Sequence, residues 1–215
     1  MPAANPAEEF VDDEFPAPVR PLVLSALRRA YLNADATIER TPYLRTPGGK
    51  YERGDLIMVA ASYELQLLVT NGDLPFDGEW EPFARPTGKH FVMRSRRARI
   101  TTSQVSDPTK RPRKADFRDN YAEDNMEPLF DYMKPSVPVG GVRLIHILHG
   151  YQNLNFIHLT YPHPTENRHV FRSENLLRLP HEVIVDQDLP RAEGPTESPD
   201  PEMIENIQRH LRDNE

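Results

Sequence analysis

Basic side chains are concentrated between residues 85 and 118, although the chain as a whole carries a formal net charge of −7. Only Asp107 and Asp116 oppose them within this segment. Arginine pairs with phosphate in a bidentate manner, and a β-ribbon beside a basic loop can straddle a phosphate backbone. We therefore expect a polyanion-binding surface made of Arg94, Arg96, Arg97, Arg99, Lys110, Arg111, Arg113, Lys114 and Arg118. The alternative is an ordinary solvated surface, because a charge run is only a footprint of such binding.

Strand parity and aromatic residues add detail to this basic segment. If residues 89–105 form one strand, His90, Arg94 and Arg96 share one face, whereas Arg97 and Arg99 lie on the other. Phe91 and Phe117 could stack on nucleic-acid bases, or could equally belong to the core.

A second group of candidate residues consists of histidines: His146, His149, His158, His163 and His169. Two strand-like runs, 144–148 and 156–161, surround a polar turn, and this spacing predicts a hairpin. In it, Leu148 faces His158 and His146 faces Thr160, so the two histidines are diagonal neighbours on one face. They could share zinc or another transition metal, with His163 or Glu166 as a third ligand, in a metal-dependent hydrolase or nuclease. The chain has no HExxH motif, and surface or hydrogen-bonded histidines remain the alternative.

Composition narrows the function classes. The 215 residues include no cysteine, which excludes disulfides, thiolate metal sites and cysteine nucleophiles. The 22 prolines against 10 glycines favour rigid loops and short elements. We find no nucleophile elbow, dinucleotide fingerprint, phosphate loop or EF-hand, and the sequence leaves the cofactor unknown. No apolar run follows a basic start, so we expect no secretory signal and a cytoplasmic protein.

The elements that must position these residues are organised around residues 54–72, the longest apolar segment. It predicts a helix that Asp55 caps and that Asn71 and Gly72 end in a left-handed turn. The helix is apolar over most of its circumference and must be covered on several faces. It is too short and too polar to span a bilayer. Glu64 could be a buried catalytic acid, but we expect it near a narrow solvent-facing seam, because buried unpaired carboxylates are rare.

The remaining pattern predicts an α+β domain over residues 19–190. A helix over 20–34 joins the central helix, and both pack on an antiparallel sheet built from segments between Trp80 and Val185. Residues 1–18 are expected to be a disordered acidic tail. Residues 191–199 form a predicted linker, followed by an amphipathic helix over 200–213.

These features favour a non-enzymatic regulatory or adaptor protein that binds nucleic acid or another polyanion through the Arg-rich hairpin and loop. The alternatives are a protein–protein interaction module that uses its acidic ends, and the metal-dependent hydrolase described above. We expect no membrane association, and the last helix could join two copies of the chain. Arginines that form a contiguous basic face would favour the first hypothesis, and arginines paired with acids would favour the second.

Overall fold

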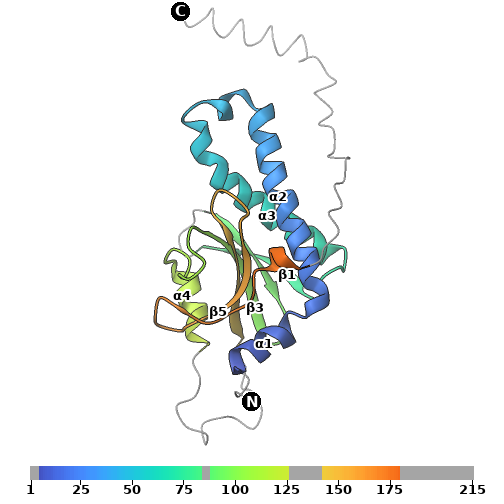
Figure 1. Ribbon diagram of the computed structural model, residues 1–215, viewed down its shortest axis with the longest axis vertical. Coiled ribbons are helices and arrows are strands. Elements are labelled where there is room, and N and C mark those ends of the chain that lie inside the picture. The colour runs from blue at the N-terminus through green and yellow to red at the C-terminus, as the bar shows by residue number, and fades with distance from the viewer. Residues whose placement is uncertain (1–4, 84–87, 126–141, 180–215) are drawn as a thin grey trace, which may run out of the picture. The chain divides into compact units, whose positions relative to one another are not determined.

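The computed structural model describes residues 5–83, 88–125 and 142–179. They belong to the first of two units into which the chain divides, Met1–Glu182. The predicted linker and last helix lie outside the described residues. The α+β class is confirmed, because helices pack on a six-stranded sheet (Figure 1). No helix in these ranges is long and apolar enough to cross a membrane.

The central helices form a hairpin, α2 (Arg20–Arg40) followed by α3 (Arg53–Thr70). Two 3-10 turns, η2 (Pro42–Arg45) and η3 (Gly49–Glu52), connect them at an end that projects from the sheet (Figure 1). The predicted left-handed turn after α3 is confirmed, because Gly72 has a φ of 78°. The predicted Asp55 cap is absent: α3 begins at Arg53 and has no side-chain cap.

Glu64 corrects a second expectation about α3. It is only 4% exposed, and its carboxylate accepts from Arg29 Nε at 2.7 Å and from Asn33 Nδ2 at 3.0 Å. Both donors belong to α2, so these two hydrogen bonds link α2 to α3. Burial of the carboxylate is tolerated here because both of its oxygens are hydrogen-bonded.

The predicted disorder of residues 1–18 is wrong for most of that segment, because α1 (Pro6–Glu14) is a helix capped by Asn5. Residues at helical spacing bury its apolar side: Ala7, Phe10 and Val11, followed by Phe15. Three of its five acids are also compensated, since Asp12 pairs with Arg20, and Asp13 and Glu14 pair with Arg97. An acidic segment can therefore fold when distant arginines neutralise it.

The sheet contains β1 (Asp77–Pro82), β2 (Lys89–Arg94), β3 (Ala98–Val105), β4 (Arg143–Gly150), β5 (Ile157–Pro162) and β6 (His169–Arg172), paired in that order. Neighbouring strands are antiparallel as predicted, except that β3 and β4 are parallel, which makes the sheet mixed. A parallel pair needs a crossover connection, and α4 (Asp116–Glu123) lies on it, where the sequence indicated only a loop.

Residues 89–105 form two strands rather than one. The chain turns at Ser95, whose hydroxyl accepts from the backbone N–H of Ala98 at 2.9 Å. As a result Arg94 lies opposite Arg99 on the same face of the sheet, contrary to the predicted parity. Residues that pair across a hairpin turn lie on the same face of the sheet, so parity counted along one continuous strand does not apply to them.

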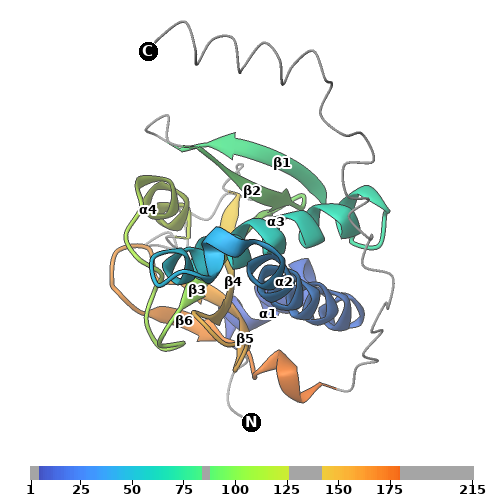
Figure 2. The same cartoon turned by 90° about the horizontal axis from the view of Figure 1, so that it is seen from above.

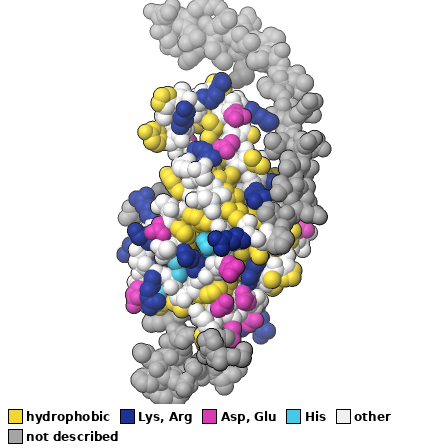
Figure 3. All heavy atoms as spheres, in the orientation of Figure 1, with side chains coloured by type: hydrophobic (Ala, Val, Ile, Leu, Met, Phe, Trp, Pro, Cys, Tyr) yellow, Lys and Arg dark blue, Asp and Glu magenta, His cyan; other side chains and the backbone are white. Residues whose placement is uncertain are grey.

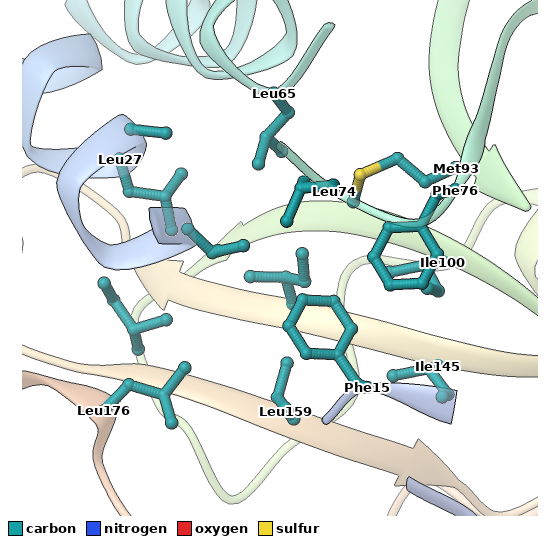
Figure 4. Packing of buried hydrophobic residues seen from close by; sticks show 14 of the residues in the cluster. Phe15, Leu27, Leu65, Leu74, Phe76, Met93, Ile100, Ile145, Leu159 and Leu176 are labelled. Carbon is teal, nitrogen blue, oxygen red and sulfur yellow. The ribbon is translucent and has the colours of Figure 1, made fainter. Parts of the chain in front are cut away.

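The two faces of the sheet differ. One packs on α1, α2 and α3 and forms the main core, which includes Phe15, Leu27, Leu65, Ile100 and Leu159 (Figure 4). The other carries α4, and Figure 2 shows α4 on the opposite side of the sheet from α1 and α2. Asn125 fixes the end of α4 there, because its side-chain amide donates to the carbonyls of Leu144 and Pro162 at 3.2 and 3.0 Å.

Candidate functional site

Most of the predicted polyanion-binding residues are ion-paired. Six of the nine lie within 4.0 Å of a carboxylate oxygen: Arg94 (Glu79 and Glu81), Arg97 (Asp13 and Glu14), Arg99 (Asp124), Lys110 (Asp107), Arg111 and Lys114 (both Asp119). Figure 3 shows Lys and Arg interspersed with Asp and Glu on the face that it displays. Arg96 and Arg113 are exposed and have no such partner among the described residues. Carboxylates therefore neutralise most of this local positive charge. The acids that pair with Arg97 come from α1, whereas the acid that pairs with Arg111 lies only eight positions away.

Arg118 on α4 differs from the other predicted residues. Within the described ranges no carboxylate lies within 4 Å of its guanidinium, whose Nη1 donates only to the Arg113 carbonyl at 2.7 Å. Its Nε is buried and makes no hydrogen bond. Burial lowers the pKa of Arg118 to about 10, and the charge of Asp119 opposes this only in part. The guanidinium thus stays charged at neutral pH and is largely desolvated. Among the described residues it has no counter-ion, and it lies over the Phe117 ring, 4.9 Å from the ring centroid.

Arg118 lines a cavity where two strands separate. β2 and β3 pair only from Val92 and Thr101 to Arg94 and Arg99, so the strands diverge beyond Thr101. A cavity of about 150 Å³ occupies this fork. Ser62 and Thr101 lie deep in it and are almost fully buried, whereas Val59, Trp80 and Lys89 form an exposed rim. Since Met58, Val59 and Ser62 belong to α3 and Arg118 to α4, the cavity reaches both faces of the sheet.

An aromatic stack forms one wall of this fork cavity. The ring of His90 stacks on Phe117 with centroids 3.9 Å apart and on Phe83 at 5.1 Å. Tyr121 meets the edge of Phe117 and donates a hydrogen bond to Glu81, which is also paired with Arg94. These contacts hold α4 against β1 and β2 and so fix the position of Phe117 beside Arg118.

Buried polar atoms without partners gather on the same face of the sheet. Nine such side-chain atoms occur among the described residues, and the α4 face accounts for all except His149 Nε2: His90 Nδ1 and Nε2, Arg94 Nε, Arg99 Nε, Ser103 Oγ, Arg118 Nε, His146 Nε2 and His169 Nδ1. Buried polar groups in folded proteins are satisfied by water or by a ligand when no protein group is available. The arginine and serine groups on this face can donate hydrogen bonds, so the face is suited to bind a ligand that carries hydrogen-bond acceptors.

Two histidines of this face are held neutral. Burial lowers the pKa of His90, while the nearby Glu81 raises it. Burial is also the main cause of the lowered pKa of His146, and the charges of Arg118, His169 and Arg111 add to it. A neutral imidazole offers one donor and one acceptor, so His90 can serve either kind of ligand atom.

The predicted hairpin register around the histidines is confirmed: Leu148 pairs with His158, and His146 pairs with Thr160. The imidazoles are nevertheless engaged in hydrogen bonds. His146 Nδ1 lies 2.7 Å from Thr101 Oγ1, and His158 Nδ1 lies 2.8 Å from the Ser173 carbonyl.

His163, a predicted third ligand, is engaged too, since its Nδ1 accepts from the backbone N–H groups of Thr165 and Glu166. In the described part of the chain, no group of three or more His, Cys, Asp or Glu residues is placed to hold a metal ion. Among the described residues the geometry therefore gives no support to the predicted metal site.

No protein-family model matches the chain, and no curated protein or solved structure is significantly similar to it. The function must accordingly be argued from the geometry of the chain itself.

The sequence pointed to some residues of the fork cavity, but it did not show that they lie together. Arg118 was predicted as one of nine equivalent cations, and Phe117 was considered for stacking. Both rings line the cavity: Phe117 is half-buried, and Phe91 is 5% exposed and also packs in the core. The role of α3 was missed, although the position of Ser62 within an otherwise apolar helical stretch was a usable signal.

Proposed function

We propose that this protein binds a small anionic ligand in the fork cavity, with the Arg118 guanidinium as its counter-charge. The observation that carries the proposal is a largely buried cation, without a carboxylate partner among the described residues, that lines a cavity. Leaving such a charge unpaired is unfavourable, and a bound anion would remove that cost. Carboxylate and phosphate groups match the planar donor fork of arginine.

The regulatory or adaptor role expected from the sequence is compatible with a site that binds a small anion. Binding of nucleic acid stays a prediction, and its basis is narrower than the sequence indicated, because only Arg96 and Arg113 combine exposure with no carboxylate partner in the described ranges. Pairing of the other cations with acids is the arrangement that favours a protein-interaction module.

A thermal-shift titration with phosphate and with acetate tests the proposed site. A ligand of the native state stabilises it by mass action, so melting should rise with either anion and not with equal concentrations of chloride. Arg118→Gln should abolish the rise, while Arg113→Gln, which changes an exposed arginine of the same segment, should preserve it.

Arg118→Gln is not expected to unfold the protein, because it removes an uncompensated charge from a largely buried position. Equal anion responses in the wild type and in both variants would contradict the proposal, as would no response in any of them.

A further inference from the structure

The size of the fork cavity limits its ligand. Its volume is about 150 Å³, and a cavity of roughly this size accommodates one benzene ring. A nucleotide or a polymer segment cannot be enclosed in that space. The ligand, or the part of it that enters, is therefore about as large as a single ring with one small substituent.

The charges around the cavity favour a single negative charge. Arg118 is the lining cation with a buried, unpartnered nitrogen, whereas Lys89 lies on the exposed rim, where water solvates it. One desolvated guanidinium balances one carboxylate, and the two planar groups form parallel hydrogen bonds. A phosphate dianion would keep an uncompensated charge in the buried part of the site.

The walls of the cavity favour a flat apolar body. Phe83 and Phe117 line it on the α4 side, and Met58 and Val59 line it on the α3 side. His90, fixed between the two phenylalanine rings, adds a neutral ring to the same wall. Aromatic walls prefer aromatic partners in offset or edge-to-face arrangements beyond the benefit of apolar burial.

We infer that the ligand is a monocyclic aromatic carboxylate, with its carboxylate on Arg118 and its ring between α3 and the aromatic wall of Phe83, His90 and Phe117. The inference rests on the proposed function and specifies its ligand class.

Trp80 gives a local readout, because it is the only tryptophan of the chain and lines the cavity. We would titrate the full chain with benzoate, cyclohexanecarboxylate, benzyl alcohol and inorganic phosphate, and follow tryptophan fluorescence together with calorimetry. Benzoate should bind about 2- to 10-fold more tightly than cyclohexanecarboxylate, the factor expected for aromatic packing geometry. Benzyl alcohol should bind about 10- to 100-fold more weakly than benzoate, because it lacks the charged hydrogen bonds.

Two variants separate the contributions of charge and ring. Arg118→Gln should remove the preference for benzoate over benzyl alcohol and keep weak binding of both. Phe117→Leu retains an apolar side chain and should reduce the preference for benzoate over cyclohexanecarboxylate to about 1-fold. Tyr43→Leu is the matched control, since Tyr43 is an exposed ring on η2 that does not line the cavity.

The possible failures are distinguishable. If phosphate, benzoate and cyclohexanecarboxylate bind equally in an Arg118-dependent way, the proposed anion site stands and the aromatic inference is overturned. If none of the anions binds, both are overturned. If benzoate is preferred but Phe117→Leu leaves the preference intact, binding occurs elsewhere and the inference is again overturned.

Discussion

Acidification should destabilise this protein through one buried histidine, His149. Its imidazole is fully buried at the end of β4, with Nδ1 2.8 Å from the Tyr31 hydroxyl oxygen. The same hydroxyl donates to the Gly150 carbonyl. A hydroxyl has a single hydrogen, so His149 must donate from Nδ1 to the tyrosine oxygen, and its Nε2 is left without a partner. Nothing at this position compensates a second proton.

The magnitude follows from the pKa. Burial lowers the pKa of His149 to about 3, against roughly 6.5 for an unperturbed histidine. The unfolded chain therefore takes up a proton as pH falls through about 6.5, while the native state does not until about pH 3. Stability is lost over this window as pH falls, at up to about 1.4 kcal/mol per pH unit. Between pH 7 and pH 5 the contribution of His149 is a loss of about 2 kcal/mol.

Urea unfolding at pH 7 and pH 5 measures this loss when the wild type is compared with His149→Leu. The variant has no titrating group at this position and keeps the bond from Tyr31 to the Gly150 carbonyl. All other histidines and carboxylates are shared, so the wild type should lose about 2 kcal/mol more than the variant. Identical pH dependence in the two proteins would refute the reasoning and would mean that water or another group reaches the imidazole in the native state.

Two further predictions concern the hairpin turn and the surface cations. Gly150→Ala should lower the free energy of unfolding by about 1–3 kcal/mol, because a Cβ there would lie 2.0 Å from the Asn153 carbonyl oxygen. Gly48→Ala is the control, since a Cβ there meets no atom within 4 Å, and equal urea midpoints for the two variants would contradict the prediction. Nucleic-acid binding, measured by fluorescence anisotropy, should fall steeply with salt and should weaken more with Arg96→Ala plus Arg113→Ala than with Arg94→Ala plus Arg99→Ala. Absence of binding to duplex and single strands at low salt would end that hypothesis.

Local patterns predicted the elements whose partners are close in sequence. The helices predicted over residues 20–34 and 54–72 are confirmed, and the first extends to Arg40. α2 buries one apolar face, and α3 is long and apolar. The register of β4 and β5 follows from a short turn, which fixes the pairing of every residue beyond it. α1 was missed because its acids indicated solvation, although Phe10 and Val11 lie at helical spacing with Ala7 and Phe15.

Long-range pairing decided the features that local patterns could not give. Arg97 is neutralised by Asp13 and Glu14, which precede it by more than 80 positions, so a window of sequence around Arg97 contains no sign of the pairing. The parallel pairing of β3 with β4 likewise depends on a crossover that a count of apolar residues does not reveal.

The fork cavity depends both on local sequence and on contacts between segments that are distant in the chain. Arg118 cannot be told apart from Arg111 or Arg113 by residue type or by local charge, since all three lie in one basic run. In the folded chain Arg111 meets Asp119, Arg113 is exposed to water, and Arg118 is largely buried beside the diverging strands. A carboxylate compensates the charge of Arg111, and water solvates that of Arg113. Within the described residues, no carboxylate compensates the charge of Arg118. A cation in that position is destabilising for the unliganded fold, so the anion that relieves it should bind and stabilise the protein together.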